Sequence, residues 1–571
     1  MTIENLRAAA MLADAPGGAP AADLPSGVYT TSLVAMLRRN KVPLVEIDPG
    51  ALGRRPDWRS AVEEERAERS DLAAEFALVA AALEADGIMP VLFKSAGGLP
   101  YRSSNVDLLV RPEQMAQAAL RLEQQGHLRF PHYREDHKLL FRRFRRGRSV
   151  ICVHLHEAIS WGRILILPGT DVVERARPPL AGETGFKVAC AEDLLLITLA
   201  HSLYETDQIR LSDLRALRLA ASSAGFDWSR AIDRARRRGW ETGFFSILSI
   251  VAELENLVYG TTKVPAEVRR QADQALQRSM WSRAYVERMK PGHAGVVPDL
   301  PYPLSKPWSK LQAAMLMLKA PGRSPDERVM DLISTAGNLL ATRMKLRCRP
   351  PVLVSLTGLD GSGKSSAIRV LSEAMSLCEI PVRVVWSRGG FTLPAQAAKR
   401  ATRAMMGEKV PGPAAMEEKR RWLSGRFVGA MFAGFVVAEQ SVHYMLRVIF
   451  PRWRGFSIVC DRYAYDTWAD LEVKLSGSPG IARAAGGLLL AIAPEPDLAI
   501  LLRLEPAEAA RRKPADAAMA VLVAQAEIFD RMAAMCSLHV IDAGRPDADV
   551  IDEVVDVALR KTFAKFAGAN S

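Results

Sequence analysis

The sequence predicts an α/β protein with two domains. The C-terminal domain is expected to have a parallel sheet covered by helices, and the N-terminal domain to be α+β with a helical half. The chain has 571 residues, which is too long for a single hydrophobic core. Strand-like and helix-like runs alternate after residue 348, as they do in βαβ units. A proline-rich stretch at 290–308 separates this region from the preceding one, because proline fixes φ and removes a backbone donor.

The predicted domain boundaries follow these changes in composition. Residues 1–27, rich in alanine, glycine and proline, are expected to form a disordered tail and not a signal peptide. Residues 28–290 form the first predicted domain, 291–347 a proline-rich linker with two helical segments, and 348–571 the second domain. Because no stretch reaches about 18 uninterrupted apolar residues, no transmembrane segment is expected.

The charge and the cysteines limit the classes of partner. The formal net charge of +12 favours anionic partners such as nucleotides, phosphorylated sugars or acidic lipid surfaces. The charge is spread along the chain, and the dense run FRRFRRGR at 141–148 is more typical of a solvated strand face, so no specific nucleic-acid partner is expected. The six cysteines include no C-x-x-C pair, which argues against a cysteine zinc site or disulfides and indicates a reducing, cytoplasmic compartment. A homodimer is left open.

One motif indicates phosphate binding. The segment GLDGSGKS at 358–365 fits G-x-x-x-x-G-K-[ST] without mismatch and lies between a strand-like and a helix-like run. Its glycines let the backbone wrap so that N–H groups point at phosphate oxygens. Lys364 is expected to reach the β- and γ-phosphates, and the Ser365 hydroxyl to ligate Mg²⁺. The predicted nucleotide-binding residues are Gly358, Gly361, Ser362, Gly363, Lys364, Ser365 and Ser366.

The strands after the motif predict where a site would form. Strand candidates lie at 352–357, 382–386, 456–460, 498–504 and 538–542. In a parallel sheet, sites lie at the carboxyl ends of the strands. The phosphate loop, Arg388 and Asp461 all follow strand ends, so we expect them to share one edge of the sheet.

The phosphate loop resembles that of the thymidylate kinases, because it has Asp360 and Gly361 inside the pattern G-x-D-G-x-G-K-S. The DRY motif at 461–463, the segment PDLAILLRLEPAEAARRK at 496–513 and VIDAGRP at 540–546 are similar to further segments of that family. The resemblance implies a nucleoside-monophosphate-kinase-like fold that uses ATP with Mg²⁺.

The matching residues have expected roles, since phosphoryl transfer depends mostly on positioning and charge neutralisation. Asp461 is expected to orient Mg²⁺ or accept a hydrogen bond from the acceptor, and Arg462 to clamp an acceptor phosphate or stabilise the transferring group. Arg511, Arg512 and Lys513 are lid candidates, with a solvated basic helix end as the alternative for the two arginines. The predicted catalytic residues are Lys364, Asp461, Arg462, Asp360 and Arg512, and the predicted metal ligands are Ser365 and Asp461.

Departures from the family concern the acceptor. Arg388 stands in the segment SRGG, which lacks the family's Glu-Pro pair. Gln440 occupies the position of an arginine that helps to hold the acceptor, and Asp466 that of a serine. These three residues are predicted to line the acceptor site. A monophosphate dianion needs an arginine clamp, and one arginine of that clamp is missing here. The acceptor is therefore left open between a nucleoside monophosphate and a hydroxyl-rich sugar or glycan, as in surface-polysaccharide synthesis. An ATP-gated binding module without an acceptor stays open.

The first domain has a second resemblance. VLFKSAGG at 91–98, NVDLLV at 105–110 and VHLHEAI at 153–159 are similar to an uncharacterised bacterial nucleotidyltransferase-like family, and the resemblance continues through helices to about residue 258. It implies an accessory domain that supplies acceptor binding, regulation or assembly.

The chemistry of that fold needs carboxylates. Two aspartates one residue apart lie on one face of a strand and, with a third, hold two Mg²⁺ ions. In this chain the corresponding residues are Asn105, Asp107 and His154, so only one carboxylate remains. Histidine prefers softer metals than Mg²⁺. The sequence therefore predicts a catalytically impaired remnant. The alternatives are a transition metal held by His154, His156 and Asp107, or slow residual activity.

Overall fold

The computed structural model has two compact units. It describes residues 7, 10, 30–47, 56–95, 97–99, 105–130, 137–145, 148–161, 163–179, 182–291, 299–320, 322–343, 350–387, 425–513 and 519–568. Unit 1 contains Met1–Arg143 and Val150–Met344, and unit 2 contains Phe144–Ser149 and Lys345–Ser571. The predicted tail at 1–27 lies outside the described residues except for two positions, and Arg388 lies outside them as well.

Unit 1 is built around a mixed six-stranded sheet with the order β3-β4-β5-β2-β1-β8. In chain order its strands are β1 (Val91–Leu92), β2 (Val106–Leu109), β3 (Leu128–Phe130), β4 (Lys138–Arg145), β5 (Arg148–His156) and β8 (Lys187–Val188). Strand β2 pairs with β5 in parallel and with β1 in antiparallel orientation, so it lies inside the sheet. All four residues of β2 are buried, as expected for an inner strand.

Two small antiparallel sheets accompany the main sheet of unit 1. Strand β6 (Ala158–Trp161) pairs with β7 (Ile164–Pro168), and β9 (Gln208–Ile209) pairs with β10 (Tyr302–Pro303). Through this second pair, residues of the predicted linker add a strand to unit 1. Leu300, Leu304 and Leu316 are buried in its main core.

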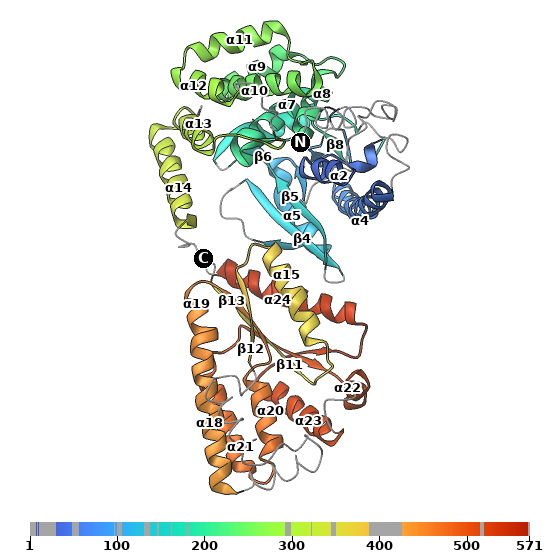
Figure 1. The fold of residues 1–571 in the computed structure, drawn as a ribbon, viewed down its shortest axis with the longest axis vertical. Coiled ribbons are helices and arrows are strands. Elements are labelled where there is room, and N and C mark those ends of the chain that lie inside the picture. The colour runs from blue at the N-terminus through green and yellow to red at the C-terminus, as the bar shows by residue number, and fades with distance from the viewer. Residues whose placement is uncertain are drawn as a thin grey trace. The chain divides into compact units, whose positions relative to one another are not determined.

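Helices form much of unit 1, and α7, α9, α11 and α12 pack against helix α10 (Figure 1). Its helices are α2 (Thr30–Arg39), η2 (Leu44–Glu46), α4 (Pro56–Ala85), η3 (Pro112–Gln114), α5 (Met115–Gln124), α6 (Gly169–Arg175), α7 (Ala191–His201), the π-helical turn η4 (Ser202–Thr206), α8 (Leu211–Ala221), α9 (Trp228–Arg237), α10 (Glu241–Tyr259), α11 (Ala266–Gln277), α12 (Met280–Met289), α13 (Lys306–Leu318) and α14 (Pro325–Arg343). Helix α9 begins at Asp227, whose carboxylate accepts the Ser229 N–H at 2.8 Å, and α10 ends at Gly260 with φ +73°.

Helix α10 is long and apolar enough to cross a membrane by length and composition, and no other helix within the described residues meets that test. However, 72% of its apolar window is buried inside the protein. Phe244, Ile247 and Leu254 are among its fully buried side chains, so α10 is the central core helix of unit 1.

Unit 2 is a parallel five-stranded sheet with helices on it, and the α/β class predicted from the sequence is confirmed. The strand order is β12-β13-β11-β14-β15, and every pair is parallel. The strands are β11 (Leu353–Gly358), β12 (Val382–Trp386), β13 (Ser457–Asp461), β14 (Leu498–Arg503) and β15 (His539–Asp542). The helices are α15 (Lys364–Leu377), α18 (Arg426–Tyr444), the π-helical turn η5 (Met445–Ile449), α19 (Phe450–Trp453), α20 (Ala464–Lys474), α21 (Pro479–Ile492), α22 (Pro506–Arg512), α23 (Met519–Met535) and α24 (Asp547–Gly568).

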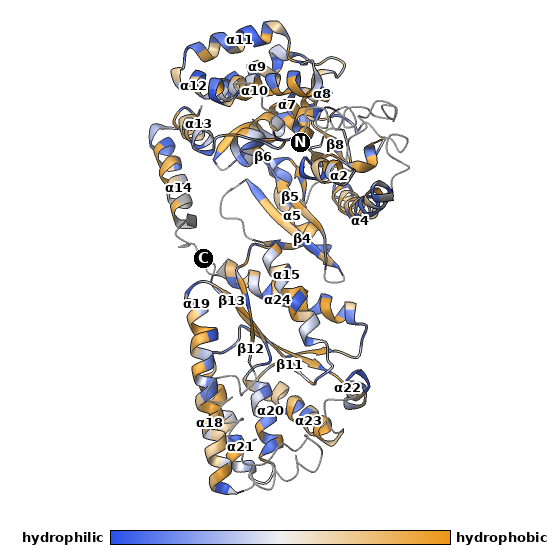
Figure 2. Ribbon diagram, viewed as in Figure 1, coloured by the Kyte–Doolittle hydropathy of each residue, from blue (hydrophilic) through white to orange (hydrophobic). Residues whose placement is uncertain are grey.

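Hydrophobic residues concentrate along the strands of unit 2 (Figure 2). Every residue of β11 is buried, which is typical of a parallel strand covered on both faces. Helices α15 and α24 pack on each other, while α18, α20 and α21 pack together. Because the five strands run in parallel, their carboxyl ends lie at one edge, and the segments after β11, β12 and β13 meet there.

Candidate functional sites

The phosphate loop of unit 2 depends on glycine at its first position. Gly358 ends β11 with φ +143°, and a Cβ atom there would lie 2.5 Å from the Leu502 carbonyl oxygen of β14. Gly363 has φ +85° and directly precedes α15. The loop therefore leads from a buried strand to the N-terminus of a helix, where unpaired N–H groups and the helix dipole favour an anion.

Lys364 is folded over this loop. Its Nζ donates to the Gly358 carbonyl at 2.8 Å and to the Leu359 carbonyl at 2.6 Å. The side chain is buried, and burial together with the nearby Arg462 cation lowers the pKa of Lys364 to about 8. The ammonium is thus held where the loop would receive phosphates, with its hydrogen-bond donors directed at the loop.

Ser365 and Asp461 form an oxygen pair beside the loop. The Ser365 hydroxyl donates to Asp461 Oδ2 at 3.2 Å. Asp461 ends β13 and stands opposite Leu356 of β11 in the sheet register. A hydroxyl and a carboxylate are ligands that Mg²⁺ accepts, and Mg²⁺ usually completes its shell with water and phosphate oxygens. This oxygen pair therefore suits a Mg²⁺ ion that accompanies a nucleotide.

Arg462 connects the turn after β13 to the phosphate loop. Its φ is +70°, a left-handed conformation that is unfavourable for arginine. Its N–H donates to the Leu356 carbonyl at 3.0 Å, which holds the turn against β11. The guanidinium pairs with Asp360 of the loop and lies 3.5 Å from Asp466 Oδ1. An uncommon backbone conformation is therefore maintained at the point where the two segments meet.

Asp466 lies beneath Arg462 in the interior of unit 2. It accepts the Thr357 hydroxyl at 2.5 Å and the Tyr463 N–H at 3.0 Å, and it caps the start of α20. Its carboxyl is fully buried, and burial raises its pKa. The sequence predicted an acceptor-binding role, whereas these contacts position Arg462 and the first turn of α20.

Gln440, which the sequence predicts to line the acceptor site, has one defined side-chain partner. It is buried on α18, and its Oε1 accepts the Ser387 hydroxyl at 3.3 Å. Ser387 follows β12, and its N–H donates to the Asp461 carbonyl at 3.1 Å. Gln440 therefore belongs to the same edge of the sheet as Asp461 and contributes a neutral amide there.

The structure distinguishes Arg512 from Arg511 as a lid candidate. Helix α22 packs over the phosphate loop, because a Cβ atom on Gly361 would lie 3.4 Å from Arg512 Cβ. The Arg512 Nη1 is 3.5 Å from the Gly361 carbonyl, and its Nε donates to Glu508 at 2.8 Å. The Arg511 side chain is 79% exposed and pairs with Glu508. Arg512 is the arginine that reaches the loop, while Ser366 lies exposed on the first turn of α15.

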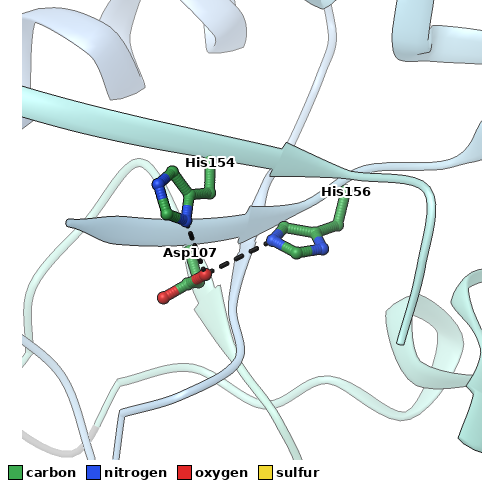
Figure 3. A group of neighbouring side chains, drawn as sticks. All are labelled: Asp107, His154 and His156. Atoms are coloured by element: carbon green, nitrogen blue, oxygen red, sulfur yellow. Dashed lines mark hydrogen bonds and ion pairs between the residues drawn. The ribbon is translucent and has the colours of Figure 1, made fainter. Parts of the chain in front are cut away.

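The nucleotidyltransferase-like residues of unit 1 also come together. Asp107 on β2 stands opposite His154 on β5, and His156 follows two positions later on the same face. Figure 3 shows both imidazoles directed at the Asp107 carboxylate. His154 Nδ1 and His156 Nε2 each lie 3.3 Å from Asp107 Oδ1. Asn105 Nδ2 donates to Asp107 Oδ2 at 3.0 Å and is 2.7 Å from His154 Nδ1.

The Asp107 carboxylate is surrounded by a lysine and two histidines in place of further carboxylates. Lys94 Nζ lies 3.2 Å from Asp107 Oδ1. Burial alone would raise the pKa of Asp107, but the Lys94 ammonium and the contacts with the His154 and His156 imidazoles hold it well below its usual range. Burial lowers the pKa of His156 to about 4 and lowers that of His154, so both imidazoles are neutral at neutral pH. This donor set does not fit two Mg²⁺ ions, which need several oxygen ligands.

Sequence reasoning missed one residue of this site. Glu205, in the π-helical turn η4, lies 3.5 Å from Lys94 Nζ and 3.2 Å from His201 Nε2, and it accepts the Trp161 indole N–H. Nothing in the sequence links Glu205 to Lys94, because the two are separated by 111 positions. The left-handed conformation of Asp207, which follows the turn, is visible only in the structure and gave no signal in the sequence.

A cavity of about 950 Å³ lies in the helical half of unit 1, between α9, α10, α12 and α13. Trp240, Gln312 and Arg278 contribute to its wall. None of the site residues predicted from the sequence lines it, so this cavity is separate from the two clusters described above.

Comparisons with known proteins agree with both resemblances. The family described as uncharacterised nucleotidyltransferase matches residues 51–256. A probable thymidylate kinase of Pyrobaculum aerophilum is 27% identical over 214 residues, covering 36% of this chain and 96% of the relative. One from Pyrobaculum calidifontis is 25% identical over 216 residues, covering 37% of this chain and 96% of the relative.

These similarities indicate an enzyme with a kinase-like part. The chain thus joins a segment of the uncharacterised nucleotidyltransferase type to a segment similar to thymidylate kinases, and the two resemblances predicted from its sequence are confirmed.

Proposed function

We propose that this protein is an ATP-dependent phosphotransferase of the nucleoside-monophosphate-kinase type, with the domain around Asp107 as an accessory. The observation that supports the proposal best is the convergence of Lys364, Ser365 and Asp461 at one edge of a parallel sheet. Catalysis of phosphoryl transfer consists largely of positioning and charge neutralisation, and these groups suit both tasks.

The proposed roles follow from the contacts. Ser365 and Asp461 would hold Mg²⁺, which neutralises the phosphates of ATP when bound. Lys364 would exchange its two loop carbonyls for phosphate oxygens. Arg512 would follow the motion of α22 toward the γ-phosphate, since its guanidinium is already close to Gly361. Arg462 would stabilise the transferring group, with Asp360 and Asp466 fixing its orientation.

The acceptor is proposed as a small molecule or a glycan. Within the described residues, Arg462 is the arginine next to Asp461, and two carboxylates already pair with it. Gln440 offers an amide where related kinases have an arginine, and it is paired with the Ser387 hydroxyl. A neutral amide and hydroxyl suit sugar hydroxyl groups better than a phosphate dianion. We therefore include a sugar or glycan acceptor as the second candidate beside a nucleoside monophosphate.

The test is transfer of the labelled γ-phosphate from ATP by the full-length protein. Separate reactions would contain dTMP, the other nucleoside monophosphates, and a panel of sugars and glycans. One acceptor is expected to be labelled at about 1–100 s⁻¹, the usual range for kinases. Rapid turnover of dTMP would exclude the hydroxyl-rich candidate.

Two variants separate transfer from binding alone. Asp461→Asn is expected to abolish labelling, while Lys474→Met, which changes an exposed lysine on α20, should retain it. ATP that binds without transfer to any acceptor, together with unchanged behaviour of Asp461→Asn, would instead support an ATP-gated binding module. The cytoplasmic location expected from the cysteines stays a prediction.

A further inference from the structure

We infer that Asp107, His154 and His156 form a binding site for one imidazole-preferring divalent metal ion, of which Zn²⁺ is the best match. The site lies in unit 1 and is independent of the function proposed for unit 2. Within the described residues, this is the one group of at least three histidine, cysteine or acidic side chains whose ligand atoms all lie within 4.8 Å of one another. The three side chains converge from two neighbouring parallel strands (Figure 3).

The distances between the donor atoms fit a tetrahedral ion. Zinc binds histidine nitrogen and carboxylate oxygen at about 2.0–2.1 Å, which places two ligands of a tetrahedron roughly 3.3–3.4 Å apart. Asp107 Oδ1 lies 3.3 Å from His154 Nδ1 and 3.3 Å from His156 Nε2. Both separations are longer than the usual range of an N–H···O hydrogen bond, about 2.7–3.2 Å. Each imidazole nitrogen therefore lies at a ligand–ligand separation from the carboxylate oxygen, and the two nitrogens lie within 4.8 Å of each other.

The hydrogen-bond pattern shows that His154 presents a lone pair, as a metal ligand must. Asn105 must direct its NH₂ group at Asp107 Oδ2, because its carbonyl oxygen would repel the carboxylate. The same NH₂ group lies 2.7 Å from His154 Nδ1, so that nitrogen must accept and has no hydrogen to donate. His154 Nδ1 therefore carries its lone pair at the cluster. An ion bound there would take the place of the Asn105 hydrogen, because one lone pair serves one partner at a time.

Lys94 supplies part of that charge, since its Nζ is 3.2 Å from Asp107 Oδ1. Its ammonium compensates the carboxylate and is not a ligand for imidazole nitrogen. A divalent ion can bind the carboxylate oxygen and both imidazole nitrogens at once. The Asp107 and His156 side chains are almost completely buried, whereas the His154 side chain is 18% exposed, so an ion would enter past His154.

The donor set selects the kind of metal. Two imidazoles and one carboxylate occur in zinc sites that keep a fourth position open for water or substrate. Mg²⁺ and Ca²⁺ prefer oxygen ligands and would receive a single carboxylate here. The substitution of histidine and asparagine for carboxylates therefore changes the metal preference of the site and need not abolish metal binding.

The experiment is metal titration of the full-length protein after treatment with a chelator. Isothermal titration calorimetry should show one Zn²⁺ per chain and no competition by excess Mg²⁺. Co²⁺ should give the intense visible absorption bands of a tetrahedral ion, which Zn²⁺ then displaces. His154→Ala and His156→Ala should each weaken Zn²⁺ binding by more than the roughly 10–100-fold that loss of a supporting hydrogen bond costs.

Three controls keep the test specific. His137→Ala changes a half-exposed histidine that pairs with Glu157, and it should retain the site. Asp461→Asn should also retain it, which separates this site from the oxygen pair beside the phosphate loop. Lys94→Met should bind Zn²⁺ at least as tightly, because the competing ammonium is gone. Each variant must melt at the wild-type temperature in the presence of chelator.

The inference is overturned by any of three results. The first is the absence of Zn²⁺ or Co²⁺ binding to the wild-type protein. The second is binding that survives both histidine substitutions. The third is Mg²⁺ binding that competes with Zn²⁺ at equal concentration.

Discussion

The phosphate loop and the Asp107 cluster show two different ways in which a site can depend on its sequence. The loop is shaped by backbone, and Gly358 and Gly363 adopt conformations that other residues rarely reach. The Asp107 cluster is shaped by a strand register, which places side chains opposite one another whatever their chemistry. A backbone cradle tolerates little change at its glycines, whereas a register can keep its geometry while its ligands change from carboxylate to imidazole.

The largest effect is expected from Lys364→Met, which tests whether the loop of unit 2 is active. The buried ammonium is the side-chain cation that the loop itself holds. Removing one such donor typically costs about 10²–10³-fold in kcat. Phosphotransfer from labelled ATP should fall by at least that factor, while Zn²⁺ binding by unit 1 is unchanged. Transfer at the wild-type rate would show that the phosphate loop is not the active site.

The double variant Asn105→Asp and His154→Asp tests whether the type of ligand sets the metal preference of the Asp107 cluster. It restores two carboxylates beside Asp107 on the same face of the sheet. Zn²⁺ affinity should fall by more than about 10–100-fold and Mg²⁺ binding should appear, because oxygen ligands replace imidazole. Metal titration checks this expectation. If the double variant keeps its preference for Zn²⁺, the ligand type does not set the metal and the comparison fails.

Gly358→Ala tests the backbone part of the comparison. The new Cβ atom would lie 2.5 Å from the Leu502 carbonyl oxygen, at φ +143°. We expect a loss of about 1–3 kcal/mol in the free energy of unfolding of unit 2. Thermal or urea unfolding would measure this loss. The transition of unit 2 is identified as the one that added ATP shifts.

The matched control is Gly487→Ala on α21, where an added Cβ atom meets nothing within 4 Å. Alanine in a helix interior is more favourable than glycine by about 0.5–1 kcal/mol, so this variant should be slightly more stable than the wild type. Equal destabilisation by both substitutions would contradict the proposed contact with Leu502.

The smallest expected effect is the change of ATP affinity with pH. The pKa of Lys364 is lowered to about 8 in the free protein by burial and by Arg462. Bound phosphate would favour the ammonium form, so above pH 8 the complex holds more protons than the free protein does. ATP affinity should therefore be nearly constant just below pH 8 and fall by at most about tenfold per pH unit above it. Calorimetric titration with Mg²⁺ held constant measures this, and affinity that rises with pH would contradict the assignment.

Much of unit 2 could be predicted from the sequence. The spacing of Gly358, Gly363 and Lys364 identifies a phosphate loop, because such a loop requires fixed residues in a short segment. Alternating strand-like and helix-like runs predict the parallel sheet, and that sheet brings Asp461 next to Ser365. The same local pattern could not distinguish Arg511 from Arg512, since adjacent helical residues point about 100° apart and only packing over Gly361 decides between them.

Local sequence determined the chemical groups of this protein, and tertiary structure determined which of them act together. The sequence alone predicted the phosphate loop, the DRY turn and, through a family resemblance, the replacement of two carboxylates around Asp107. Only the folded chain showed that Asp466 is buried beneath Arg462 and that Glu205 faces Lys94. It also showed that His154 and His156 converge on a single carboxylate oxygen. The physical reason is that side-chain identity is a local property, whereas burial, charge balance and donor spacing depend on residues that are distant in the chain.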